Sequence, residues 1–260
     1  MVWIRVCIRL VFIGLAGASA LAEEVQVRYA EGTARGFMVL RDTGGAPIAN
    51  GDEEQTMRDG VVTSRLTFRF KDGSVYEETT TFTQRGTFRL LTNHLIQKGP
   101  TFPRQLESWI DTSKGRVKAH SSKDGKVDDA EETFEFPPDL ANGMLFTIVK
   151  NAPAEHQMSV SYLAFTPKPR IIKMVFTREG TETLQAAQSS HAAARFLMKA
   201  DIGGIAGAVA AVTGKKPADT RMWVITGIAP TFAGSEGPLY SEGPVWRIDL
   251  VSPGRKPSRE

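Results

Sequence analysis

Turn signals at short intervals between residues 25 and 136 constrain the fold more than any other feature. A polar residue is followed by glycine at Asp42–Gly45, Asp59–Gly60, Asp72–Gly73, Arg85–Gly86, Lys114–Gly115 and Asp124–Gly125. Such pairs tolerate the positive φ of tight hairpin turns. Between the turns, apolar and polar residues alternate: in the segment 62–70, the apolar Val62, Leu66, Phe68 and Phe70 share one face. The pattern predicts an antiparallel meander with one buried side.

The period changes after Pro137–Pro138. There Asp139 is expected to cap a helix of about three turns that ends at Lys150, because apolar residues recur at helical spacing. Strand-like segments then resume at 158–165, 170–177, 183–188, 193–199, 221–226 and 245–250. We therefore expect a mainly β protein: one large curved antiparallel sheet, similar to a half-barrel, with one or two short helices packed on it. Residues 23–253 are expected to form a single β-rich domain, and 254–260 a flexible basic tail.

The first 22 residues have the pattern of a secretory signal peptide. They contain no acid, two arginines, an apolar run from Leu10 to Leu15, and a small-residue ending at Ala22, after which cleavage is expected. A buried first strand or a membrane anchor is the alternative, but the apolar run is too short to span a bilayer. We therefore expect export to the periplasm or the extracellular space and no transmembrane span in the mature chain.

Loss of this leader would change both the cysteine count and the charge. The only cysteine, Cys7, lies inside it, so a mature chain has no disulfide, thiol nucleophile or cysteine metal ligand. Without the two leader arginines, 30 basic residues stand against 29 acidic ones. The remaining basic residues form only small clusters, and no nucleic-acid partner is expected.

The segment 202–214 is uncharged and built of small and β-branched residues. It contains Ile205 and Val209, and its Gly203-xxx-Gly207 spacing would allow close backbone packing of a short helix. A loop that touches a membrane and a flap over a ligand cavity are the alternatives.

Motifs for common chemistries are missing. Gly214–Lys215 is not a phosphate-binding loop, because residues 209 and 216 are valine and lysine. No dinucleotide fingerprint is present, and Gly234-Ser235-Glu236-Gly237 misses the nucleophile-elbow pattern by one residue. No cofactor is expected.

Histidines and acids do not form a recognisable site either. His94, His120, His156 and His191 are too far apart in sequence for a short metal motif. The acidic groups 52–54 and 128–132 lack the alternating ligands of a calcium loop and are expected at solvated hairpin edges, where charge resists edge-to-edge pairing. We therefore assign no catalytic residue and no metal site.

The C-terminal region carries a resemblance. The resemblance rests on residues 203–207, 214–220, 223–225, 229–232, 236–240 (Glu-Gly-Pro-Leu-Tyr) and 243–248 (Gly-Pro-Val-Trp-Arg-Ile). Together, these segments resemble a family of uncharacterised secreted bacterial proteins. That family offers no catalytic motif to transfer. More distantly, the strand-rich pattern is similar to the half-barrel of periplasmic lipoprotein carriers, in which a curved sheet wraps helices over an apolar cavity; this implies a fold rather than a function.

These observations favour an exported, non-catalytic protein that binds an apolar or amphiphilic ligand such as a lipid. The ligand-binding residues expected from the apolar segments and aromatic positions are Leu145, Ile148, Ile205, Val209, Trp223 and Trp246. One alternative is a secreted hydrolase whose site combines a histidine with distant carboxylates. Another is a cell-envelope scaffold that binds a protein partner.

Overall fold

The structure is a computed structural model that describes residues 24–166, 168–186, 189–203 and 217–251. Its first eight strands are β1 (Ala34–Arg41), β2 (Pro47–Arg58), β3 (Val61–Phe70), β4 (Val75–Arg85), β5 (Thr87–Lys98), β6 (Arg104–Asp111), β7 (Arg116–Lys123) and β8 (Lys126–Thr133). They are followed by α1 (Leu145–Asn151), β9 (Met158–Thr166), β10 (Lys168–Ala186), β11 (Ser189–Asp201), β12 (Thr220–Ile225), β13 (Thr231–Pro238) and β14 (Val245–Val251). The expected mainly β class is confirmed.

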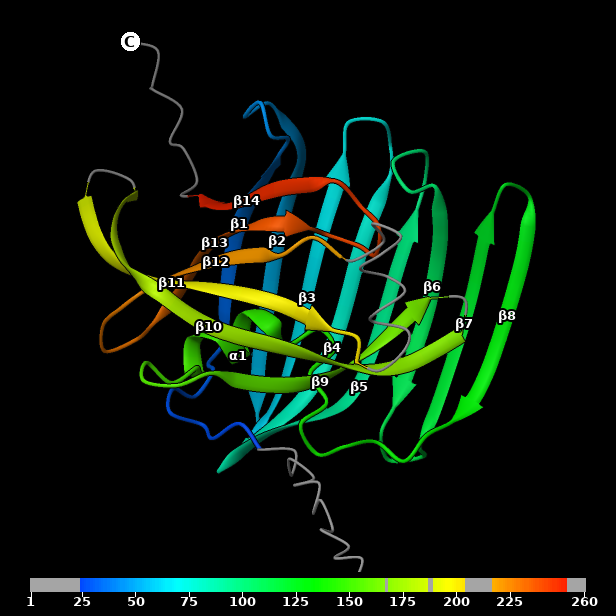
Figure 1. Cartoon of the computed structure of the whole chain (residues 1–260), viewed down its shortest axis with the longest axis horizontal. Coiled ribbons are helices and arrows are strands. Elements are labelled where there is room, and N and C mark those ends of the chain that lie inside the picture. The colour runs from blue at the N-terminus through cyan, green and yellow to red at the C-terminus, as the bar shows by residue number, and fades with distance from the viewer. Residues whose placement is uncertain (1–23, 167, 187–188, 204–216, 252–260) are drawn as a thin grey trace, which may run out of the picture.

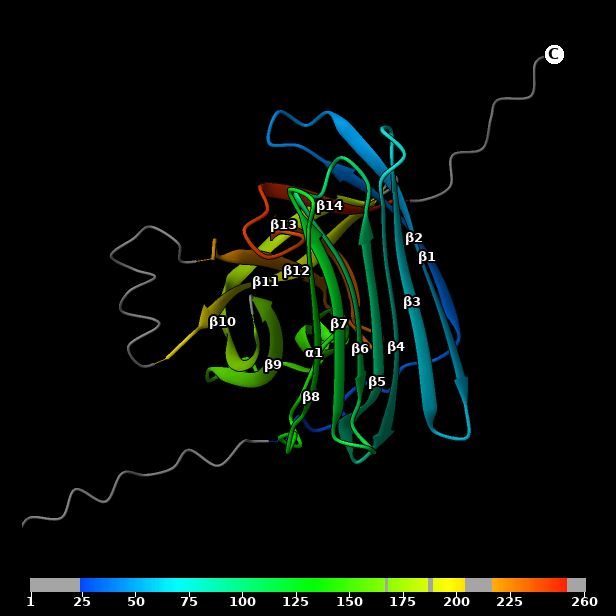
Figure 2. The ribbon, with the colours of Figure 1, turned by 90° about the vertical axis from the view of Figure 1, so that its right-hand side faces the viewer.

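All of these strands belong to one antiparallel sheet, in the order β8-β7-β6-β5-β4-β3-β2-β1-β14-β13-β12-β11-β10-β9. The pairing of β1 with β14 joins two meanders, β1–β8 and β9–β14. In Figure 1 the strands β2–β8 form a broad layer, and β9–β14 cross in front of it. Figure 2 shows α1 between the two layers. The sheet stays open, with β8 and β9 as its edges.

Two hairpins confirm the turn prediction directly. Asp59 and Gly60, between β2 and β3, have φ of 53° and 77°, and Asp124 and Gly125, between β7 and β8, have φ of 52° and 76°. Positive φ at both central residues defines the primed turns whose twist matches that of the flanking strands.

The core lies between the two layers. Phe68 and Phe82 on the β1–β8 side are fully buried, as are Val160, Phe176 and Ile148 from the facing side. Large buried side chains at alternate strand positions remove apolar surface from water and hold the layers together.

The predicted helix over 139–150 is wrong in its bounds. Only Leu145–Asn151 is helical, and Met144, which precedes it, makes no side-chain cap. Gly143 has φ +68, a left-handed conformation that a helix cannot contain. Asn142 instead binds β9: its Nδ2 donates to the Leu163 carbonyl (2.9 Å), and its Oδ1 accepts from the Leu163 amide (2.8 Å).

Two further expectations are corrected. The segments 170–177 and 183–188 are not separate strands, because β10 continues from the first through 183–186 of the second, with a register irregularity between Arg178 and Gly180. The acids 52–54 are not at a hairpin edge, since β2 lies inside the sheet. On the outer face Asp52 pairs with Arg69 (3.1 Å) and Glu54 with Arg35 (3.2 Å).

The acids 128–132, by contrast, lie on the edge strand β8, as expected. The predicted leader, the basic tail and residues 204–214 lie outside the described residues, as do Ile205 and Val209.

Candidate functional site

A cavity of about 390 Å³ lies where one edge of the open sheet meets the β9–β10 hairpin. Figures 1 and 2 show this hairpin close to β6, β7 and β8. The cavity is lined by Arg104, Leu106, Ala119, Ser121, Asp128, Asp129, Ala130, Glu131, Glu132, Phe165, Lys168 and Pro169. Its volume is at the lower end of the range for small-molecule sites.

Strand register explains why space is left here. Ala119 on β7 lies directly opposite Ala130 on β8, and both line the cavity. Directly opposed side chains are only about 5 Å apart, so two methyl groups leave the gap that larger residues would close. Leu106 and Phe165 add apolar surface to the lining.

Strand alternation divides the acids of β8 between its two faces. Asp129 and Glu131 turn to the outer face, where Asp129 Oδ1 is 2.7 Å from His120 Nδ1 and Glu131 Oε2 is 3.3 Å from Lys118 Nζ. Asp128 and Glu132 have the same orientation as Ala130, and lie opposite the buried Ser121 and Val117. Arg104 Nη2 donates to Ser121 Oγ (2.8 Å) at the Asp128 end of this wall. The cavity therefore combines an apolar floor with charged ends.

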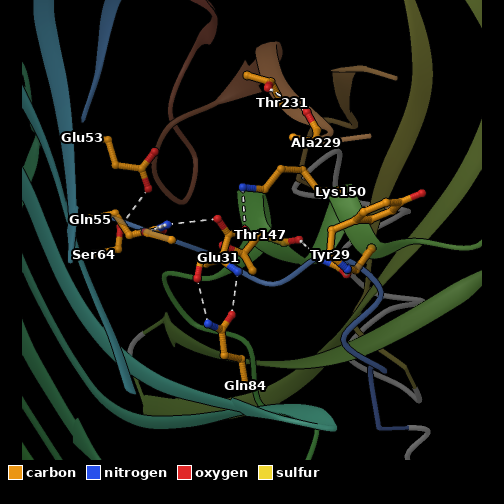
Figure 3. Close-up of polar contacts among 12 residues, drawn as sticks. Tyr29, Glu31, Glu53, Gln55, Ser64, Gln84, Thr147, Lys150, Ala229 and Thr231 are labelled. Atoms are coloured by element: carbon orange, nitrogen blue, oxygen red, sulfur yellow. Dashed lines mark hydrogen bonds and ion pairs between the residues drawn. The ribbon is translucent and has the colours of Figure 1, made fainter. Parts of the chain in front are cut away.

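A second polar cluster lies deeper, around Glu31 (Figure 3). Lys150 on α1 places Nζ 2.6 Å from Glu31 Oε1, and Gln55 Nε2 donates to Oε2 (3.0 Å). Gln84 binds the Glu31 backbone twice: it accepts from the amide (2.6 Å) and donates to the carbonyl (2.8 Å). Both charged side chains are largely buried, so this pair anchors α1 and the N-terminal segment to β2 and β4.

Glu53 faces the same interior from β2. Its carboxyl accepts a hydrogen bond from Ser64 Oγ (2.8 Å). Burial raises the pKa of Glu53, and the Ser64 hydrogen bond and the Lys150 charge only partly oppose this.

Glu78 on β4 is more deeply buried, 9% exposed. It accepts hydrogen bonds from Tyr76 Oη (2.9 Å) and Asn93 Nδ2 (2.9 Å). Burial raises the pKa of Glu78 despite these bonds, and burial together with the Glu78 charge raises the pKa of Tyr76 and of Tyr162 on β9. All these groups are hydrogen-bonded or packed inside the molecule, so they stabilise the interior polar core rather than face a substrate.

A buried Ser–Asp–Lys cluster is the arrangement closest to hydrolase chemistry. Ser161 Oγ donates to Asp139 Oδ1 (2.7 Å), and Lys173 Nζ lies 2.8 Å from Asp139 Oδ2 and 3.0 Å from Ser161 Oγ. Ser161 is 0% exposed, so no substrate reaches its hydroxyl. The cluster attaches residues 139–142 to β9 and β10.

Histidine–carboxylate pairs occur on the outer face of the sheet. His94 Nε2 is 3.0 Å from Glu107 Oε1 and stacks on Trp109, and the second pair is His120–Asp129. Neither histidine has a serine or threonine hydroxyl within hydrogen-bond distance among the described residues. The same part of the chain contains no group of three or more His, Cys, Asp or Glu side chains that would hold a metal ion.

The structure does not bring the residues expected from sequence into one pocket. Ile148 is in the core and Leu145 packs against the core, whereas the Trp246 ring contacts the Phe70 ring in a tilted arrangement (5.5 Å between ring centroids). Trp223 lies on the outer face and donates its Nε1 hydrogen to Glu182. None of the described four lines the cavity.

Sequence reasoning missed the cavity itself. The acidic edge strand was visible in the sequence, but the Ala119–Ala130 opposition and the approach of the β9–β10 hairpin depend on register and tertiary packing.

These features define an open antiparallel sheet, folded over one short helix, with a charged cavity at one edge. No family model matches the chain, and no curated protein matches it. Among solved structures, the chain is similar to the crystal structure of the hypothetical lipoprotein YmcC from Escherichia coli K12: 11% identity, 86% of each chain covered, TM-score 0.37. This likeness concerns the fold only. No helix among the described residues is both long and apolar enough to cross a bilayer.

Proposed function

We propose that this protein is an exported, non-catalytic binding protein that holds an amphiphilic ligand, such as a lipid, in the cavity between β6–β8 and the β9–β10 hairpin. The observation that supports this most strongly is the lining, which combines the apolar Leu106, Ala119, Ala130 and Phe165 with charged side chains. An amphiphile needs both environments, and apolar area removed from water supplies most of the binding free energy.

The leader pattern of residues 1–22 supports export. The proposal places the ligand differently from the sequence-based expectation. Leu145, Ile148 and Trp246 do not contact the ligand in this proposal, because they pack in or against the core and do not line the cavity. Ile205 and Val209 stay predicted apolar contacts from the 202–214 segment. Trp223 has no part in it, because it lies on the outer face.

Filling the cavity tests the proposal. The variant Ala130→Phe places a ring over Ala119, and is expected to weaken binding of the fluorophore N-phenyl-1-naphthylamine at least about tenfold. The matched control is Ala192→Phe, at an exposed position on β11 outside the cavity lining, and is expected to bind as the wild type does.

Circular dichroism would confirm that both variants keep the strand signal. Equal fluorophore affinity in the wild type and Ala130→Phe would contradict the proposal, because the probe would then bind elsewhere.

A further inference from the structure

Four charged side chains of the cavity lining are not accounted for by ion pairing. Arg104 comes from β6 and Lys168 from the start of β10; Asp128 and Glu132 come from β8. Among the described residues, none of the four has an oppositely charged partner within 4.0 Å. The neighbouring outer-face acids do have such partners: Glu131 pairs with both Arg116 and Lys118.

The positions of these charges suggest how they are used. Arg104 donates to Ser121, which lies directly opposite Asp128. Glu132 is four residues further along β8, or about 13 Å from Asp128. The Ala119–Ala130 floor lies between these two positions. Charges of both signs therefore surround an apolar patch, and none of these four side chains forms an ion pair within 4.0 Å with another described residue.

Ligands of a single charge match this arrangement poorly. An anion bound by Arg104 would lie close to Asp128, and a cation bound by Asp128 would lie close to Arg104. In each case the ligand gains one ion pair and meets one like charge, so the two effects oppose each other. A ligand with both charges gains from both groups.

We propose that the cavity selects a zwitterionic amphiphile. The anionic group of its head accepts hydrogen bonds from the Arg104 guanidinium, which suits phosphate or carboxylate oxygens, with Lys168 adding positive charge. The cationic group lies against Asp128, and the chain lies on Ala119 and Ala130. This proposal rests on the proposed function and specifies its ligand class.

Calorimetric titration with four probes of equal chain length, each below its critical micelle concentration, tests the selection. The probes are dodecylphosphocholine (zwitterionic), dodecanoate (anionic), dodecyltrimethylammonium (cationic) and dodecyl maltoside (uncharged). Dodecylphosphocholine is expected to bind at least about tenfold tighter than each of the others, because it alone pairs with both charge signs.

Charge variants identify the groups responsible. Arg104→Gln is expected to weaken dodecylphosphocholine and dodecanoate about tenfold and to leave dodecyl maltoside unchanged. Asp128→Asn is expected to weaken dodecylphosphocholine and to strengthen dodecanoate. The matched control, Glu107→Gln on β6, removes an outer-face carboxylate that is not part of the cavity lining and is expected to change none of the four affinities.

Two results would overturn the inference in distinguishable ways. If the four probes bind equally and Ala130→Phe abolishes all of them, the cavity holds the chain but does not recognise the head; the ligand class is then wrong and the proposed function stands. If no probe binds, or if Ala130→Phe leaves binding unchanged, the proposed function itself fails.

Discussion

Gly143 fixes the path of the chain into α1, and its replacement by alanine is predicted to destabilise the fold strongly. Its φ of +68 costs an L-residue about 1–2 kcal/mol. An added Cβ would be 1.9 Å from Thr80 Oγ1 and 2.6 Å from Asn93 Nδ2. Both atoms are buried, and Asn93 also binds Glu78, so neither side chain can move away freely. Overpacking of this kind costs about 1–3 kcal/mol, so Gly143→Ala should lower the free energy of unfolding by about 2–5 kcal/mol.

Urea denaturation followed by tryptophan fluorescence and circular dichroism measures this loss. The matched control is Gly73→Ala in the β3–β4 turn, where φ is +84 and nothing lies within 4 Å of the added Cβ. It retains only the conformational cost, about 1–2 kcal/mol. If Gly143→Ala loses no more stability than Gly73→Ala, the close contact with Thr80 and Asn93 is not a constraint and the reasoning is wrong.

Two further predictions concern the interior polar groups. Burial raises the pKa of Glu78 above its ordinary value of 4.5, so the folded state keeps this proton to a higher pH than the unfolded chain does. The free energy of unfolding should therefore fall as the pH rises from about 4.5 through the raised pKa. In urea titrations at a series of pH values, Glu78→Gln should flatten this fall of the unfolding free energy with pH. An equally steep fall in the variant would exclude Glu78 as its source. Asn142→Ala should cost about 2–4 kcal/mol in urea unfolding, because it leaves the buried amide and carbonyl of Leu163 without their partner; a loss below about 1 kcal/mol would show that water or a neighbour replaces the amide.

Strands and turns could be predicted because their signals are local. Alternation over residues 62–70 reports which face is buried, and Asp59–Gly60 needs only its own backbone preferences to form a turn. The start of α1 could not be predicted in this way. Asn142 forms its hydrogen bonds with Leu163, and Gly143 closes against Thr80, so both depend on strands distant in sequence.

The candidate site was predictable only in part. Trp223 was expected among the ligand-binding residues, but it lies between the buried Met222 and Val224 on β12, and strand alternation turns its indole to the outer face. The cavity was not predictable, because it depends on the opposition of Ala119 and Ala130 across the β7–β8 hairpin. The approach of the β9–β10 hairpin to this wall is likewise a tertiary effect.

Native mass spectrometry of the protein purified from its export compartment, with organic extraction of what co-purifies, tests the central claim most directly. The account predicts a stoichiometric amphiphile of one mass class on the wild type and on Ala192→Phe, and its loss from Ala130→Phe. A wild-type protein that carries no such mass, and that takes up none when incubated with dodecylphosphocholine, would contradict it.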